Sequence, residues 1–213
     1  MNHWLQWRDQ TPGKYVRQYM VNLNQWAGWN FGGDRLFGGG NVNMHWTLQN
    51  NWRTGFGLNA NAGGVRDRST RGGPVVMTNR NLSLWHYIDF DDRRTVFPGY
   101  NGYIERDGQG TFRFNANPRL TWRPSRAVRL ETGLRFNRND DDAQWVENVE
   151  DAHGTPHYVF GRLEQRTVAM TLRANYTMSP TLSFQSYAEP FVSAGRYQRF
   201  RELTSGRAAA YAD

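Results

Sequence analysis

Strict alternation of polar and apolar residues is the feature that most limits the folds open to this chain. The stretch NVNMHWTLQ, residues 41–49, places Val42, Met44, Trp46 and Leu48 at every second position. Asparagine, histidine, threonine and glutamine fill the positions between them. A β-strand points successive side chains to opposite faces, so this stretch predicts a strand with one apolar and one polar face.

The same alternation recurs along the chain with few helical candidates between the segments. It predicts nine strands, at residues 15–29, 36–48, 52–62, from 81 onward, 95–105, 112–122, 128–137, 158–176 and 182–192. The chain is therefore expected to be all-β, an antiparallel up-and-down meander of about 9–10 long strands. We expect one β unit over residues 1–213, with poorly ordered ends at 1–14 and 204–213.

Side chains that face each other in a hairpin must share a face, and this fixes the expected registers. A loop at residues 49–51 places Met44 opposite Phe56. A three-residue loop at 124–126 places Leu120 opposite Leu130. Pro118 lies within the apolar set of its strand, where it removes a ladder hydrogen bond, so a bulge or kink is expected there.

Composition bears on what the apolar face contacts. The 213 residues are 38% hydrophobic with a mean hydropathy of -0.80, which is poor for a compact core, yet 15% are aromatic and 9 are Trp. No run approaches the roughly 18 apolar residues of a membrane helix, but a membrane barrel strand needs only about 10 alternating residues. The chain contains no cysteine, so disulfides and thiol chemistry are excluded.

Strand length, aromatic placement and loop length favour a membrane barrel. The predicted strands are longer than is usual in soluble sheets. Aromatic residues gather near short turns, and the connections near residues 70 and 147, at the opposite end, are long. We therefore expect a transmembrane β-barrel of the bacterial outer membrane, or the C-terminal part of a larger barrel. The alternative is a soluble or periplasmic β-sheet module that binds sugar or lipid on its apolar face.

Several stretches resemble a known family: RGGP at residues 71–74, YVFGRLEQRT at 158–167, SPTLSFQSYAEPFVSAGRY at 179–197, and the hairpin from residue 112 to 146. They are similar to the C-terminal barrel region of a bacterial outer-membrane family of unknown function, whose members often carry a carbohydrate-binding family 9-like domain before the barrel. The resemblance covers roughly residues 39–203 and implies location and architecture but no activity. This sequence departs from the family in lacking the upstream domain, a signal peptide and a closing C-terminal strand that ends in an aromatic residue. We therefore expect a fragment, a truncated gene product or one part of a larger barrel.

Candidate ligand-binding residues lie on the polar faces of the strands. They are arginines and one acid, expected to line a hydrated lumen, and either select anionic solutes or form a lattice that holds the sheet: Arg113, Arg119, Arg129, Glu131, Arg135 and Arg173. The acidic stretch from 138 to 157 is predicted to be a long loop. Weak metal candidates there are Asp140, Asp141, Asp142 and Glu147, but no known ligand spacing occurs, and no metal is predicted.

Nothing in the sequence predicts catalysis or a cofactor. Ser83 and His86 have opposite parity on a strand and cannot cooperate as in a hydrolase triad, so a barrel hydrolase is a remote alternative. The net charge of +7 is carried almost wholly by arginine, since Lys14 is the only lysine. The stretch GRYQRFR lacks an RNA-binding signature and is expected to be a loop, so no nucleic-acid partner is predicted. The expected partners are outer-membrane lipid, lipopolysaccharide, glycans, and a domain or partner chain that completes the barrel.

Overall fold

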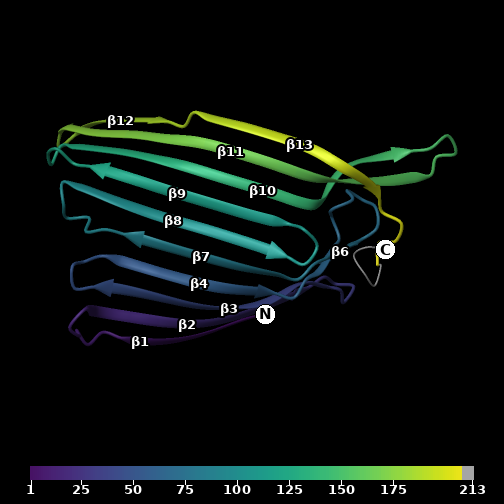
Figure 1. The fold of residues 1–213 in the computed structure, drawn as a ribbon, viewed down its shortest axis with the longest axis horizontal. Helices are drawn as coiled ribbons and strands as arrows, with labels where there is room; N and C mark the ends of the chain where they lie inside the picture. Colours follow the sequence, from purple (N-terminus) through teal and green to yellow (C-terminus); the bar gives the residue numbers. More distant parts are fainter. Residues whose placement is uncertain (208–213) are drawn as a thin grey trace.

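The computed structural model describes residues 1–207, and they form an antiparallel β-meander (Figure 1). The predicted all-β fold is thereby confirmed. No helix in this part of the chain is long and apolar enough to cross a membrane. The strands are β1 (Asn2–Asp9), β2 (Val16–Trp29), β3 (Arg35–Leu48), β4 (Arg53–Asn61), β5 (Gly64–Arg66), β6 (Val76–Thr78), β7 (Asn81–Asp89), β8 (Val96–Asp107), β9 (Phe112–Trp122), β10 (Val128–Glu150), β11 (Pro156–Ser179), β12 (Leu182–Ala188) and β13 (Phe191–Glu202).

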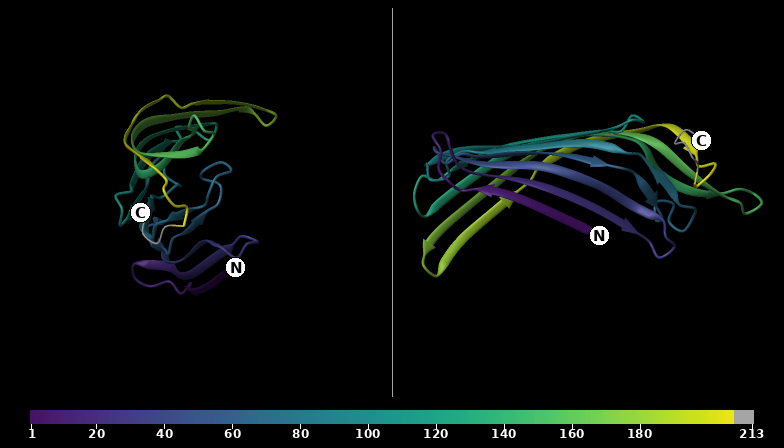
Figure 2. Two further views of the ribbon diagram at one scale, coloured as in Figure 1. Left: turned by 90° about the vertical axis from the view of Figure 1, so that its right-hand side faces the viewer. Right: turned by 90° about the horizontal axis from the view of Figure 1, so that it is seen from below.

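The main sheet follows the order β1-β2-β3-β4-β7-β8-β9-β10-β11, and β12 and β13 then share the free side of β11. β5 and β6 form a separate two-stranded ribbon. The sheet is curved into a trough with β1 along one rim and β12 and β13 along the other (Figure 2). Within residues 1–207 no strand pairing joins these rims, so the sheet is open and not a closed barrel.

Burial in this sheet is the reverse of that in a water-soluble protein. Among the described residues only Val65, Phe160 and Ala169 are buried apolar side chains. Eleven polar or charged residues are buried, including Asn41 and Asn43 on β3. The sheet therefore has no apolar core within residues 1–207.

The apolar side chains lie instead on the convex face, where no second layer of the described chain covers them. Leu58 on β4 is 52% exposed, Leu172 on β11 is 40% exposed, and Met44 and Leu130 are half-buried. The polar face is the concave one, because the ribbon β5–β6 lies within the trough and covers polar-face residues such as Asn61 and Asn81 (Figure 2).

The apolar side of β10 has a defined height. Its outward side chains are apolar or small from Val128 to Phe136, and charges begin at Arg138 and Asp140. Eight residue steps span about 27 Å along a strand. On β11 the outward apolar run likewise ends where Arg166 pairs with Asp140 at 2.5 Å. The convex face is thus an apolar belt that stops at a band of ion pairs.

Several sequence expectations about the elements are wrong. Residues 2–9, expected in a poorly ordered end, form β1 and pair with β2 along their whole length. The acidic stretch 138–157 is not a loop, because β10 and β11 continue through it as a projecting hairpin (Figure 1). GRYQRFR belongs to β13. The other poorly ordered end was predicted at residues 204–213. Residues 208–213 of this end lie outside the described residues.

The hairpin registers give a mixed result. Met44 pairs with Phe56 as expected. Trp122 pairs with Leu130 and Leu120 with Thr132, so the predicted register of the β9–β10 hairpin is wrong by two residues and its connection is longer. The register runs unbroken past Pro118 on both sides of β9, so the expected bulge is absent, although no β10 residue pairs with Pro118.

Candidate ligand-binding site

A ladder of side-chain amides crosses the concave face. Asn22 Nδ2 donates to Asn43 Oδ1 (2.7 Å), Asn24 Nδ2 to Asn41 Oδ1 (3.0 Å), Asn41 Nδ2 to Asn59 Oδ1 (2.7 Å), Asn59 Nδ2 to Ser83 Oγ (2.9 Å) and Asn61 Nδ2 to Asn81 Oδ1 (2.8 Å). These bonds link β2, β3, β4 and β7 by side chains as well as by backbone. Since a buried amide needs hydrogen-bond partners, the ladder explains how so many polar groups are buried here.

The predicted arginines all lie on the concave face but do not gather at one site. Arg119 pairs with Asp89, Arg135 with Glu189, and Arg129 with Glu131 at 3.2 Å. The guanidinium of Arg173 lies 5.3 Å from the centre of the Tyr187 ring. Four of the five predicted arginines thus form an ion pair with a nearby carboxylate or lie over an aromatic ring. The predicted acid, Glu131, is the ion-pair partner of Arg129. Glu131 and Arg173 border a groove at Leu120 and Leu172, Arg129 borders another at the turn after β9, and Arg113 lines a cavity beneath β5–β6.

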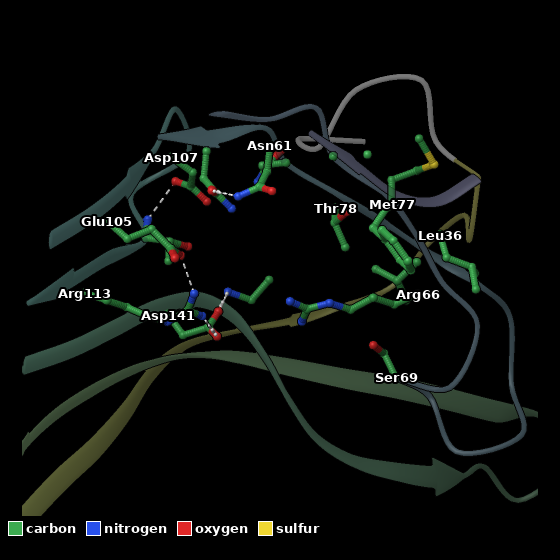
Figure 3. Close-up of a pocket in the computed structure, with 18 of the residues that line it drawn as sticks. Leu36, Asn61, Arg66, Ser69, Met77, Thr78, Glu105, Asp107, Arg113 and Asp141 are labelled. Carbon is green, nitrogen blue, oxygen red and sulfur yellow. Dashed lines mark hydrogen bonds and ion pairs between the residues drawn. The ribbon is translucent and has the colours of Figure 1, made fainter. Parts of the chain in front are cut away.

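That cavity, of about 270 Å3, lies between the concave face and the ribbon β5–β6 at the end of the trough (Figure 3). The sheet supplies a floor that includes Glu105, Asp107 and Asp141 around Arg113. Arg113 forms an ion pair with Glu105 and another with Asp141 at 3.1 Å. We call this cavity the roofed pocket.

The connection between β4 and β7 supplies the roof, and the RGGP stretch fastens it to the far strands. The guanidinium of Arg71 lies 4.0 Å from the centre of the Trp145 ring on β10. Asn148 Nδ2 donates to the Thr70 carbonyl at 2.8 Å. A Cβ on Gly73 would lie 2.1 Å from Tyr158 Cε1, so only glycine permits this contact. The long loop predicted near residue 70 is therefore folded back across the sheet.

The roof and floor differ in how their polar groups are satisfied. Arg113, Glu105 and Asp141 on the floor neutralise one another. On the roof, the side chains of Arg66 and Ser69 make no ion pair or hydrogen bond with any residue within 1–207. The floor of the pocket therefore consists of side chains held in ion pairs, whereas the side chains of Arg66 and Ser69 above it are available to a ligand.

The weak metal candidates do not converge on one point. Asp140 points to the convex side between Arg138 (2.7 Å) and Arg166 (2.5 Å). Asp141 points to the concave side and pairs with Arg113. Asp142 pairs with Arg162 at 3.1 Å. These carboxylates are thus neutralised by arginine, Glu147 is exposed farther along β10, and the described residues hold no cluster of three potential metal ligands.

The projecting hairpin of β10 and β11 is tied to the end of β13. His157 Nδ1 lies 2.6 Å from a carboxylate oxygen of Glu202, and His157 Nε2 lies 3.7 Å from Asp151. The hydrogen bond with Glu202, with a smaller contribution from Asp151, raises the pKa of His157 above its usual value. Protonation of this histidine therefore strengthens the contact between the two strands.

A set of rings on the concave face was missed by the sequence analysis. The ring centres of Trp85 and Tyr87 are 6.3 Å apart with near-parallel planes, and His45 lies 5.5 Å from Trp85. A Cβ on Gly57 would lie 2.5 Å from Trp85 Cε2, so the indole lies flat on bare backbone. We call these three rings the ring platform. In each strand these rings stand an even number of residues from an asparagine or serine of the polar face. This spacing was the sequence signal that could have placed them on the same face.

The alternative hypothesis of a barrel hydrolase depends on Ser83 and His86. Ser83 is buried on the concave face, where it accepts the hydrogen bond from Asn59. His86 is exposed on the convex face, with its ring centre 5.1 Å from that of Tyr100. The prediction that these two residues point to opposite faces is confirmed.

Comparison with known proteins gives a family but no described relative. A search of curated proteins found no match, and neither did a search of solved structures. A family model described as "Domain of unknown function (DUF5916)" matches residues 1–212. This match spans the strands, the roof and the projecting hairpin alike, and the chain therefore belongs to the DUF5916 family.

Proposed function

We propose that this chain is a strand-built segment of a bacterial outer-membrane β-barrel, with a binding, transport or structural role in which the concave face meets hydrated solutes such as glycans. The reversed burial carries this proposal: the side chains that avoid water are exposed, and those that favour it are buried and hydrogen-bonded. A sheet with this arrangement is stable when hydrocarbon covers its convex face, because membrane barrels alternate apolar-out and polar-in.

The dimensions of the apolar belt also support this role. The outward run from Val128 to Phe136 spans about 27 Å along the strand, and a strand tilt of about 40° reduces its height to about 20 Å, close to the apolar band of membrane barrels. Charges such as Arg138 then begin at the level where polar headgroups would lie. Trp122 and Tyr176 lie near the opposite limit of the belt, which suits rings at an interface.

The rims of the trough indicate which partners the proposal requires. Trp7 on β1 is 64% exposed and Val192 on β13 is 75% exposed, and both rims carry unpaired backbone groups. Unpaired strand edges are not tolerated in hydrocarbon. The proposed partners are therefore membrane lipid and lipopolysaccharide on the convex face, and further strands, from an upstream domain or a partner chain, at the rims.

The resemblance to outer-membrane barrels extends the proposal to an accompanying carbohydrate-binding domain and to glycans as ligands. The proposal assigns no catalytic reaction and no cofactor to the chain.

Single-cysteine labelling tests the proposed placement, because the native chain has no cysteine. Leu172→Cys places a fluorophore on the convex face, and Thr171→Cys, one residue away, places it on the concave face. In lipid vesicles we expect brominated acyl chains to quench the label at residue 172, and aqueous iodide to quench the label at 171. Iodide quenching of both labels, with no effect of the brominated lipid, would show that the convex face is not in the bilayer.

A second candidate is a soluble or periplasmic sheet module that binds sugar or lipid on its apolar face. Two grooves on the sheet favour it: one of about 590 Å3, lined partly by Leu23, Val42 and Leu58, and one of about 460 Å3 at Leu120 and Leu172. A chain that stays monomeric without detergent, and that binds lipid monomers there in a saturable way, would favour this candidate over the membrane segment.

A further inference from the structure

We propose that the concave face binds an oligosaccharide along a track that runs from the ring platform to the roofed pocket. This inference rests on the proposed function only in requiring that the concave face meets water. It names the class of ligand that the proposed barrel segment would bind. The track follows β4 and β7, whose concave-side residues pair as Gly57 with Trp85, Asn59 with Ser83, and Asn61 with Asn81.

The platform end of the track offers a flat ring with one free face. Because the indole of Trp85 lies against the backbone of Gly57, its opposite face points into the trough. His45 and Tyr87 hold the group in place, since His45 Nδ1 and the Tyr87 hydroxyl lie 2.9 Å apart. An aromatic face of this kind packs against the apolar C–H face of a sugar ring.

The indole N–H is also available to a ligand. Trp85 Nε1 donates to no residue within 1–207, yet no buried side-chain nitrogen or oxygen in this part of the chain lacks a partner. The N–H of Trp85 therefore reaches the solvent of the trough. It points outward in the plane of the ring, at the edge of the indole, where a ligand hydroxyl can accept its hydrogen bond.

The middle of the track supplies donors and acceptors side by side. Asn61 Nδ2 donates to Asn81 Oδ1 at 2.8 Å, which fixes both amides. Asn61 Oδ1 and Asn81 Nδ2 then have no partner in the described part of the chain, so an acceptor and a donor lie side by side in the lining of the roofed pocket. A neighbouring pair of sugar hydroxyls can donate to the first and accept from the second.

The pocket end determines which charges the ligand can carry. On the floor, three carboxylates (Glu105, Asp107 and Asp141) outnumber the single guanidinium of Arg113. This surplus repels a polyphosphate, and so a nucleic acid. Arg66 lies on the roof with no ion-pair partner among residues 1–207. Arg66 can therefore pair with a single carboxylate, which favours a neutral or uronate-containing glycan.

The length of the track sets the size of the ligand. Four residue steps lead from Asn81 to Trp85, a distance of about 13 Å along a strand. One sugar ring cannot span it, whereas a short oligosaccharide contacts the platform, the amides and the pocket at once.

Isothermal titration calorimetry on the full chain in detergent micelles tests this inference. The probes are soluble hexasaccharides: an α-linked glucan, a β-linked xylan, and a β-linked hexasaccharide with a single uronate unit. We expect saturable binding of at least one of them, weakened about tenfold by Trp85→Ala. Trp85→Phe keeps a ring but removes the N–H, and it should cause a smaller loss than Trp85→Ala. Arg66→Gln should weaken the hexasaccharide with a single uronate unit by about tenfold and leave the neutral glycans unchanged.

Tyr100→Ala is the matched control, because Tyr100 packs against His86 on the convex face. It should leave every affinity unchanged, and circular dichroism of each variant verifies the fold. The inference is wrong if none of the hexasaccharides binds, if Tyr100→Ala and Trp85→Ala weaken binding equally, or if a single-stranded oligonucleotide binds more tightly than any sugar. Lipid quenching of the label at residue 172 in vesicles tests the membrane placement independently, so either proposal can fail without the other.

Discussion

Replacing Leu172 by arginine puts a charge at the centre of the proposed belt. On β11 the outward apolar run extends from Tyr176 to Val168, and Leu172 lies midway along it with 40% of its surface exposed. A charge at the midplane of a membrane barrel costs about 2–4 kcal/mol. On a water-facing sheet the same surface change costs less than about 0.5 kcal/mol. The two environments therefore predict clearly different losses of stability.

Reversible urea unfolding in lipid vesicles, followed by tryptophan fluorescence, measures this difference. With a denaturant slope of about 2 kcal/mol per M, Leu172→Arg should lower the midpoint by about 1–2 M. Tyr176→Arg, at the edge of the belt, should cost only about 0–1 kcal/mol and serves as the depth control. Equal shifts for the two variants, or a shift at Leu172 no larger than a surface substitution gives, would refute the membrane placement.

Three further predictions concern the concave face and the projecting hairpin. Gly73→Ala should clash with Tyr158, cost about 1–3 kcal/mol as overpacking does, and speed tryptic cleavage of the roof relative to wild type. Asn43→Ala should cost about 1–3 kcal/mol in urea unfolding, because it leaves the buried amide of Asn22 without its acceptor. The raised pKa of His157 means that its pairing with Glu202 is fully present below about pH 6.5 and is lost as pH rises through the raised value. Amide exchange of β13 should therefore quicken over that upper range in wild type but show no such step in His157→Gln, and an unchanged step in the variant would contradict this assignment.

The alternation of polar and apolar residues predicted the strands well, because the polarity of each residue indicates which face of the sheet its side chain lies on. Residues 41–49 form part of β3 with the expected faces, and Met44 pairs with Phe56 as the short loop requires. The β9–β10 register was wrong because parity fixes only the face, and a shift of two residues preserves it.

The projecting hairpin was hidden by its charges. Asp140, Asp141 and Asp142 resemble a solvated loop in sequence, but each carboxylate pairs with an arginine distant in sequence, such as Arg113 or Arg166. A single sequence does not show such pairings. The roofed pocket was unpredictable for the same reason, since its roof folds across β8 and β9 to reach β10.

The absence of an apolar core within residues 1–207 changes what holds the sheet together. In a soluble domain, burial of apolar surface is the main favourable term in folding. In this sheet that surface stays exposed, so the internal interactions are the backbone ladders, the amide ladder of Asn22, Asn41 and Asn43, and the ion pairs of Arg113. Each such bond has a small net value in water, where the separated groups bind solvent instead. Where hydrocarbon covers one face, an unpaired backbone group costs several kcal/mol, and the same ladders become decisive. The stability of the sheet therefore depends on whether hydrocarbon or water covers its convex face. The substitution of Leu172 by arginine tests this dependence directly.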